Sequence, residues 1–399
     1  MNWRATEWWV LAGCFLASVG VNAFMIAPSS IAPLFVAHFD IPTAAAGNIV
    51  SAAIVGSLFT QIPGGYLLDR YDNRWVVVPA VAGFVAAVLA IQVVGSFEAF
   101  MALRVLGGIV GGFVFTAGAN VVGQVFPADR QGFATGLYMT SPPVSFALAH
   151  ATSPLIGAAV GPLPVFLLHA AVTVVGTVLF LLVAPGAIRS AEPPTAGEFA
   201  RALRNRAVIL VACSAFSVYA LYLFLNTWLP TYGTDVLSLS IPVAGFVTAL
   251  VPLIGILSRP SGGWLSSRLG SRRAVLAGGL LVGLALLVAI PFVDAIPLFL
   301  VLLAVAAFTV QLGMGVYYVL IRELATPGTE GTSLTVMTTI GFTGSFSAPI
   351  VGGWLISTYS WPVAFATFAA VGVLGTAALV PVSEPGPGAI APTADSGQD

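Results

Sequence analysis

Residues 61–70 read QIPGGYLLDR, and residues 259–268 read RPSGGWLSSR. The two stretches lie 198 residues apart, from 61 to 259, close to half of the 399-residue chain. They share a Gly-Gly pair, an aromatic residue, a Leu and a final Arg. Ala46-Gly47 and Ala244-Gly245 match at the same spacing. The chain therefore contains two copies of one unit.

Further matches extend the repeat toward the C-terminal end of each copy. SPLIG at 153–157 corresponds to APIVG at 348–352, and Pro127 and Gly132 correspond to Pro327 and Gly331. A charged, proline-containing stretch lies between the copies. These matches predict an N-terminal half at 1–184, a linker at 185–206, a C-terminal half at 207–382 and a disordered tail at 383–399.

The composition indicates that lipid is the solvent for most of the chain. Hydrophobic residues make up 58% of it and charged residues only 7%, and the mean hydropathy is +1.01. A soluble domain needs roughly a quarter charged residues to cover its surface. Cys14 and Cys213 lie in apolar runs, which predicts no disulfide or metal site. We expect no cofactor, no enzymatic activity and no nucleic-acid partner.

Apolar runs long enough to cross a bilayer, about 20 residues each, occur twelve times. Their length and the lack of strict alternation favour helices over barrel strands. The predicted spans are 8–37, 45–68, 75–95, 98–125, 132–159, 164–184, 207–232, 242–266, 274–293, 297–321, 331–357 and 362–381.

The arginines predict the orientation of these spans. With a cytoplasmic N-terminus, twelve of the fourteen basic residues fall on the cytoplasmic side, whereas Asp40, Asp235 and Asp294 fall outside. This is the asymmetry expected of cytoplasmic loops, so both termini are predicted to be inside. The cytoplasmic set is Arg4, Arg70, Arg74, Arg130, Arg189, Arg201, Arg204, Arg206, Arg268, Arg272, Arg273 and Arg322. Six helices in each copy make the repeat a parallel one.

The loop after the second span resembles a signature of the major facilitator superfamily, G-x-x-x-D-R-x-G-R-R. The first copy offers Gly65, Asp69, Arg70 and Arg74, with Asp72 at the usual glycine; the second offers Gly263, Arg268, Gly270, Arg272 and Arg273. The fourth span resembles another signature of that family, with Arg104 followed by Gly107, Gly108, Gly111 and Gly112.

The resemblance implies a twelve-helix, all-α plasma-membrane transporter, monomeric and working by alternating access. It implies a gating role for Asp69, Arg70, Arg74 and Arg268, which close the cytoplasmic side in the family. The alternative for the arginines is that they only follow the charge asymmetry of cytoplasmic loops.

Arg259 is the most informative charge. It lies nine residues before Arg268, about 13 Å deep at 1.5 Å per residue, and no Asp or Glu lies in the middle of any predicted span. A charge at this depth is costly and normally faces the bundle interior, so an anionic substrate is expected to neutralise it. The Arg-Pro-x-Gly-Gly setting resembles monocarboxylate and oxalate/formate transporters. Nitrate transporters of the superfamily have a comparable Arg in the eighth span and a second one in the second span. Gln61 stands at that second position here, which argues against a close nitrate-type site.

Other polar residues lie deep in spans that line the cavity in the family. Each is a candidate substrate-binding residue, with an ordinary interhelical hydrogen bond as the alternative. The candidates are Arg104, Asn22, Asn120, Tyr222, Asn226, Gln311, Tyr317 and Tyr318. For Arg104 the alternative is helix packing. His150 titrates near neutral pH and is the candidate for proton coupling, with a quiet buried histidine as the alternative.

Together these features predict a secondary transporter of a small organic anion of the carboxylate type. A drug or amphiphile exporter is an alternative, although such proteins usually bury a carboxylate and none is visible here. A transporter-like sensor is another, and it would be expected to carry an additional domain.

Overall fold

The computed structural model describes residues 3–60, 63–64, 67–68, 71–184, 188, 196–326 and 329–384. Its regular elements are all helical within these ranges. Eleven helical stretches are long and apolar enough to cross a membrane. The predicted second span is represented by the shorter α3 (Ala45–Leu58), which the described residues do not follow continuously to position 68. The predicted number of twelve is therefore not confirmed.

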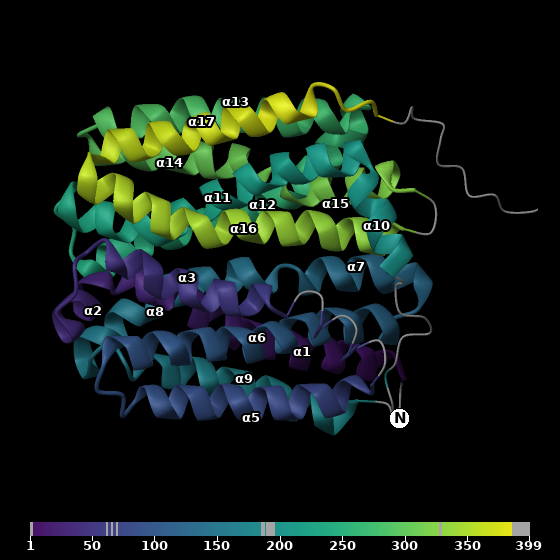
Figure 1. The fold of residues 1–399 in the computed structure, drawn as a ribbon, viewed down its shortest axis with the longest axis horizontal. Coiled ribbons are helices and arrows are strands. Elements are labelled where there is room, and N and C mark those ends of the chain that lie inside the picture. Colours follow the sequence, from purple (N-terminus) through teal and green to yellow (C-terminus); the bar gives the residue numbers. More distant parts are fainter. Residues whose placement is uncertain are drawn as a thin grey trace, which may run out of the picture.

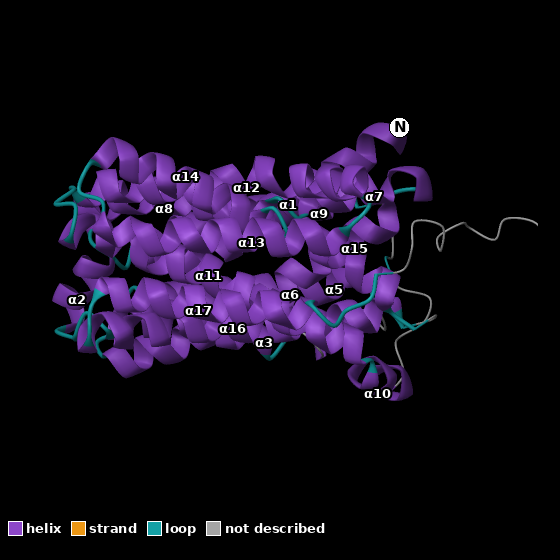
Figure 2. Cartoon of the chain, turned by 90° about the horizontal axis from the view of Figure 1, so that it is seen from above, coloured by secondary structure: helices purple, strands orange, loops and turns teal. Residues whose placement is uncertain are grey.

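The helices form two groups that follow the order of the chain (Figure 1). The first group comprises α1 (Trp3–Ser30), α2 (Ala32–Phe39), α3, α5 (Asn73–Ile91), α6 (Phe97–Val125), α7 (Ala128–Tyr138), α8 (Ser141–Val160) and α9 (Val165–Val183). The second comprises α10 (Ala196–Arg204), α11 (Arg206–Asp235), α12 (Ile241–Leu269), α13 (Arg272–Ala289), η1 (Ile290–Phe292), α14 (Ile296–Gln311), α15 (Met314–Leu324), α16 (Glu330–Thr358) and α17 (Trp361–Leu379). The long helices run side by side between the two ends of the bundle (Figure 2).

Three predicted spans are interrupted. The first breaks at Ile31 between α1 and α2, where Pro33 supplies no N–H to continue α1. The fifth breaks between α7 and α8, just before Pro142 and Pro143. The tenth breaks at Leu312 and Gly313 between α14 and α15. Part of the predicted linker is also helical, as α10.

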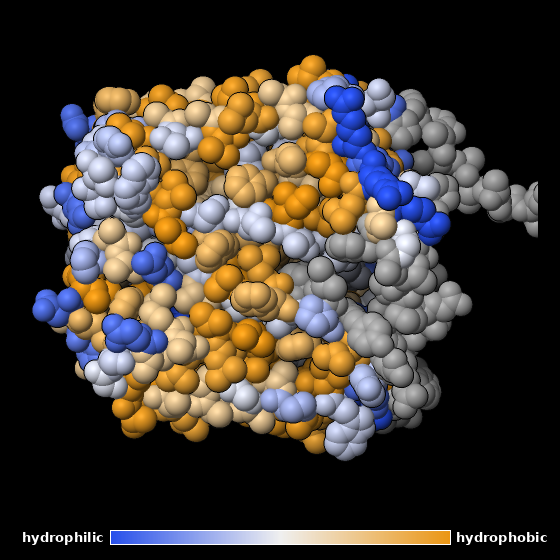
Figure 3. Space-filling view, viewed as in Figure 1, coloured by the Kyte–Doolittle hydropathy of each residue, from blue (hydrophilic) through white to orange (hydrophobic). Residues whose placement is uncertain are grey.

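The surface agrees with a bilayer environment. Apolar residues cover the middle of the face in Figure 3, and hydrophilic residues gather toward the two ends. Large apolar side chains point outward from three different helices, with Leu182, Leu257 and Leu374 each at least 70% exposed. Contiguous exposed apolar surface of this kind is unfavourable in water and suits contact with lipid.

The two ends of the bundle carry different charges. Figure 1 shows α7, α10 and α15 at the end that also holds the N-terminus, and α2 at the opposite end. The first end, called the arginine-rich end, carries Arg130, Arg201, Arg204, Arg268, Arg272 and Arg322. The other, called the acidic end, carries Asp40, Asp235 and Asp294, at the ends of α2 and α11 and before α14.

The two halves meet most closely at the acidic end. The main helix pairs that join them are α8 with α12, α3 with α16, and α1 with α11. A Cβ at Gly47 of α3 would collide with the carbonyl of Pro349 in α16, and a Cβ at Gly245 of α12 would collide with the carbonyl of His150 in α8. The Ser51 hydroxyl donates to the Phe346 carbonyl at 2.7 Å, again between halves. Small residues thus allow the helix backbones to touch. Such close packing holds the helices together in lipid, where the hydrophobic effect does not drive their association.

The arginine-rich end is built differently. The main packing partners of α7 are α6 and α1, and those of α15 are α11, α12, α13 and α16. Each of these two helices is therefore packed within its own half. The contacts between halves are concentrated toward the acidic end.

Gly47→Leu is expected to separate the halves at the acidic end. Overfilling a packed contact costs about 1–3 kcal/mol, and the obstacle here is a backbone carbonyl. We expect the thermal unfolding midpoint of purified protein to fall and the distance between spin labels at positions 38 and 240 to lengthen. Gly278→Leu is the control, because a Cβ at Gly278 meets no atom within 4 Å. An unchanged distance distribution in Gly47→Leu would contradict the close contact.

Candidate functional site

Arg259 lies inside α12, ten residues before the end of the helix at Leu269. This is about 15 Å from the arginine-rich end at 1.5 Å per residue. Its guanidinium Nη2 donates to the Gln311 Oε1 of α14 at 3.4 Å. Its Cζ lies 5.5 Å from the centre of the Tyr222 ring on α11. Arg259 therefore sits deep in the bundle, among three helices of the second half.

No carboxylate of the described residues neutralises the charge of Arg259. Within the described residues, arginine–carboxylate pairs join Arg74 to Asp72, Arg130 to Glu7 and Arg272 to Glu323, and none involves Arg259. The Nε of Arg259 is buried and makes no hydrogen bond there. Such a donor is normally paired in a folded protein. The guanidinium thus retains both a charge and a free N–H for a ligand.

Tyrosine hydroxyls accompany this arginine. The Tyr222 hydroxyl is buried and finds no hydrogen-bond partner among the described residues. Tyr219 lies one turn away on the same helix, and its hydroxyl is 3.0 Å from that of Tyr318 on α15. Tyr219 was not among the residues predicted for the site. Its spacing from Tyr222, which places both on one helix face, was the available signal.

His150 joins the two halves next to this cluster. Its Nε2 lies 3.2 Å from the Asn226 Oδ1 of α11, and its Nδ1 is hydrogen-bonded to the Ser30 hydroxyl of α1. The amide of Asn226 donates to the Tyr222 carbonyl at 2.8 Å, which turns Oδ1 toward the imidazole. A neutral ring with hydrogen on Nε2 satisfies all three groups; this tautomer is assigned from the network.

Phe146 makes a second contact between the halves at this level. Its ring, on α8, is stacked on Tyr222 of α11 with centroids 5.7 Å apart. Neither Phe146 nor Ser30 was predicted from the sequence. An aromatic residue or a serine in an apolar span gives no signal of the partner that it meets across the bundle.

Arg104 is placed apart from Arg259, in the first half. It is fully buried in α6, and it donates to the carbonyls of Phe24 at 2.5 Å, Met25 at 2.8 Å and Ile49 at 3.2 Å. The Phe24 carbonyl lacks its usual helical donor, because residue 28 is a proline. The Phe24 ring lies 4.2 Å from the guanidinium carbon. This geometry favours the packing alternative for Arg104 over substrate binding.

Three other predicted residues bond within their own halves. The amide of Asn22 donates to the Ser18 carbonyl at 2.9 Å. Asn120 lies toward the arginine-rich end of α6, where its amide is 3.4 Å from the Asn73 Oδ1. The Tyr317 hydroxyl is 2.7 Å from the Ser214 hydroxyl. None of these bonds involves Arg259, so the structure gathers Tyr222, Gln311 and, through Tyr222, Asn226 around it.

The predicted gating residues are only partly visible. Asp69 and Arg70 lie outside the described residues. Arg74 pairs with Asp72 at 2.7 Å, in its own half. Burial of Asp72 acts to raise the pKa of its carboxyl, but hydrogen bonds from the Arg74 side chain and from the Ile188 and Arg74 backbone together lower that pKa. Arg268 lies over the Trp264 ring at 5.4 Å.

The second half has a related arrangement with a different carboxylate. Glu384, within the segment predicted to be disordered, accepts hydrogen bonds from the Ser271 hydroxyl and the Arg272 and Arg273 backbone at the start of α13. Arg272 also pairs with Glu323 at 3.2 Å. A carboxylate is favoured at a helix N-terminus. Residues 385–399 lie outside the described residues.

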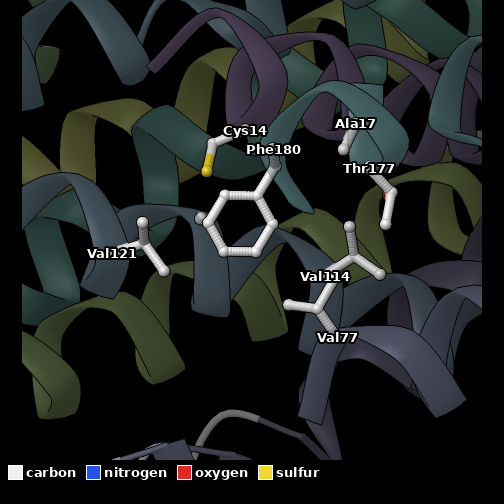
Figure 4. Close-up of a pocket in the computed structure, with 8 residues that line it drawn as sticks. Cys14, Ala17, Val77, Val114, Val121, Thr177 and Phe180 are labelled. Carbon is white, nitrogen blue, oxygen red and sulfur yellow. The ribbon is translucent and has the colours of Figure 1, made fainter. Parts of the chain in front are cut away.

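A separate small cavity lies inside the first half, among α1, α5, α6 and α9 (Figure 4). Its lining is Cys14, Ala17, Val77, Val114, Gly118, Val121, Thr177 and Phe180. The Thr177 hydroxyl already donates to the Thr173 carbonyl. With no charged side chain in this lining, the cavity has little to offer a polar ligand.

The chain is similar to a family model and to curated relatives that are all membrane transporters. The family model described as Major Facilitator Superfamily matches residues 10–287 and 234–398. The probable nitrate/nitrite transporter NarK2 of Mycobacterium tuberculosis (strain ATCC 25618 / H37Rv) is 27% identical over 326 residues, covering 79% of this chain and 80% of that protein. The probable galactarate/D-glucarate transporter GudP of Bacillus subtilis (strain 168) is 23% identical over 401 residues, covering 88% and 86%.

A solved structure shows the same fold. It is a bacterial homolog of the human lysosomal transporter Spinster in an inward-facing and unoccupied conformation, and it aligns with a TM-score of 0.78. The alignment covers 94% of this chain and 95% of that one at 14% identity.

Arg104→Lys and Arg104→Gln are expected to destabilise the fold, because neither side chain can reach three carbonyls on two helices. Each hydrogen bond of a charged group contributes about 1.5–3 kcal/mol, so the thermal unfolding midpoint of both variants should fall clearly. Arg322→Gln is the control, since Arg322 is exposed at the end of α15. Equal midpoints for Arg104→Gln and Arg322→Gln would show that Arg104 does not hold α1 and α3 to α6.

Proposed function

The chain belongs to the Major Facilitator Superfamily and is a multi-pass secondary transporter of the plasma membrane, not an enzyme; from this premise we propose that it carries a small organic anion whose carboxylate binds Arg259. The substrate would lie between the halves, near mid-membrane. It would be released by alternating access as the halves rock about it.

The observation that supports this proposal is the unpaired guanidinium of Arg259. It is the arginine deep in the bundle that keeps an Nε–H without an acceptor among the described residues, whereas the donors of Arg104 go to three carbonyls. A guanidinium binds a carboxylate through two parallel hydrogen bonds. The free hydroxyl of Tyr222 is a further donor for the same ligand.

The contacts between the halves support an inward-facing state. The arginine-rich end is proposed to face the cytoplasm, following the charge asymmetry of inner loops. The halves are in backbone contact at the acidic, outer end, and α7 and α15 pack within their own halves at the inner end. Arg74 correspondingly bonds within its own half, as expected of a gate that is open.

Nitrate is the second candidate, because one relative carries the name of a nitrate/nitrite transporter. Nitrate is also a planar anion with oxygens that can accept two guanidinium hydrogen bonds. A carboxylate remains first because Arg259 is the one deep arginine in the described part of the chain that keeps an N–H for a ligand, and because another relative is named for the transport of sugar acids.

Arg259 variants test the substrate class. Arg259→Lys keeps the charge but loses the two-pronged geometry, so counterflow of formate, lactate and nitrate into proteoliposomes should fall at least about tenfold, the effect of losing 1.4 kcal/mol of binding. Arg259→Gln should do at least as much damage, yet its thermal midpoint should be retained or raised, because an uncompensated charge is removed. Arg322→Gln is the control and should transport normally.

Two outcomes would overturn the anion proposal. Normal counterflow by Arg259→Gln would mean that the arginine does not bind the substrate. Transport of neutral or cationic compounds, unaffected by either Arg259 variant, would instead favour the drug-exporter alternative.

His150 is proposed as the proton-coupling group. It is a titratable side chain hydrogen-bonded to both halves beside the substrate site. His150→Gln should abolish accumulation driven by a pH gradient but spare counterflow, which needs no coupling. His169→Gln is the matched control, because His169 is also buried in the first half but lacks hydrogen bonds among the described residues. Full gradient-driven accumulation by His150→Gln would exclude the coupling role.

A further inference from the structure

Gln311 accepts a hydrogen bond from the guanidinium of Arg259. It is the last residue of α14 and is 1% exposed. Its Nε2 donates to the Val251 carbonyl of α12 at 2.7 Å and to the Ala307 carbonyl of its own helix at 3.1 Å. Both amide hydrogens are thus used, and Oε1 is left facing Arg259. A flipped amide would place oxygen against two carbonyls, so this orientation is the favourable one.

The space for this amide is made by a missing side chain. A Cβ at Gly255, one turn before Arg259 on α12, would collide with Oε1 of Gln311. The helix that carries the arginine therefore also makes room for its partner. The Arg259–Gln311 pair is therefore part of the packing between α12 and α14.

An amide differs from a carboxylate in what it does to an arginine. An amide oxygen accepts a hydrogen bond and holds the guanidinium in place, but it leaves the full positive charge. A carboxylate at the same position would form an internal ion pair, as Asp72 does with Arg74. Arg259 therefore keeps its positive charge. Because a buried cation without a partner is unfavourable, this charge favours binding of a substrate anion.

We propose that Gln311 is the residue that sets anion selectivity: it positions Arg259 through a neutral acceptor and thereby leaves the arginine's charge and Nε–H to the substrate. The inference rests on the proposed function of Arg259. It identifies the substrate class more narrowly, as an anion with a single planar oxyanion group that receives N–H donors from Arg259 and an O–H donor from Tyr222.

Gln311→Glu is the main test, measured as counterflow of formate, lactate and nitrate at acidic and alkaline pH. When ionised, the new carboxylate pairs with Arg259 and excludes the anion, so KM should rise at least about tenfold relative to wild type. When protonated, its O–H can donate to the Val251 carbonyl as the amide does, and transport should return toward wild type at acidic pH. The variant-to-wild-type ratio removes any pH dependence of wild type itself.

Few other groups near Gln311 can produce this pH effect. Arg259 on α12 is the charged group against it, and the titratable side chains that accompany Arg259 are Tyr219 and Tyr222 on α11 and Tyr318 on α15. His150 of α8 also lies beside this cluster, through Asn226. It is present in both proteins, so a change in the variant-to-wild-type ratio between acidic and neutral pH reports the introduced carboxylate.

Gln311→Met separates positioning from folding. Methionine has nearly the shape of glutamine and leaves the charge of Arg259 unchanged, but it removes the hydrogen-bond acceptor. KM should rise about five- to tenfold, as for one lost hydrogen bond of about 1 kcal/mol. We expect kcat to be retained and the effect on KM not to change with pH. Tyr317→Phe is the control: it removes a buried hydroxyl bonded to Ser214, which should lower the thermal midpoint but leave KM unchanged.

The results distinguish the two proposals. If wild type moves no anion of the panel, or if Arg259→Gln transports normally, the proposed function fails. If transport depends on Arg259 but Gln311→Glu keeps the wild-type KM at alkaline pH, or Gln311→Met lowers stability without changing KM, the role assigned to Gln311 is wrong while that of Arg259 stands.

Discussion

Inside a bilayer, every charge and every broken helical hydrogen bond has to be satisfied by the protein itself, because lipid tails offer neither donors nor acceptors. The first half meets this constraint by combining two unfavourable features. Pro28 leaves the Phe24 carbonyl without its helical donor, and Arg104 supplies that donor together with bonds to Met25 and Ile49. Pro28 and Arg104 thus compensate for each other and hold α1, α3 and α6 as one unit.

In the second half, the hydrogen-bonding groups around Arg259 are not all satisfied by the described residues. Gln311 satisfies one N–H, while Nε and the Tyr222 hydroxyl remain without partners in the described structure. A protein that is only a scaffold has no reason to retain such groups at mid-membrane, since each one costs stability. Their convergence near one point supports the proposed binding site over ordinary interhelical hydrogen bonding.

Through α11, the candidate site is linked to the contact between the halves at the acidic end. Asn226 lies one turn beyond Tyr222, bonds to its carbonyl, and also bonds to His150 of the other half. The His150 carbonyl in turn packs against Gly245, and it lacks a helical donor because residue 154 is a proline. We infer that a ligand pulling on Tyr222 acts on the same turn of α11 that fastens the halves together.

The sequence alone predicted an all-helical membrane protein of the superfamily that the comparisons show. Apolar runs predicted twelve spans, of which the described residues show eleven helical stretches long and apolar enough to cross a membrane. The depth of Arg259, with no acidic residue nearby, predicted the centre of the candidate site. The sequence could not show that the N–H donors of Arg104 are taken by backbone carbonyls, because backbone acceptors have no signature in the sequence. The helix breaks were only partly readable: Pro33, Pro142 and Pro143 signalled two of them, but Leu312 and Gly313 did not. Partners such as Ser30 and Phe146 depend on helix rotation and crossing angle, which hydropathy does not determine.

The number of free charges also bears on which anions fit. A monoanion balances the single charge at Arg259, and the complex is then neutral in a medium of low dielectric constant. A dianion would bring a second negative charge, and the other deeply buried arginine, Arg104, already gives its hydrogen bonds to Phe24, Met25 and Ile49. Leaving that second charge unpaired would cost several kcal/mol. On this ground a monocarboxylate, or a planar inorganic monoanion of similar shape, suits the site better than a dicarboxylate such as those for which the relative GudP is named.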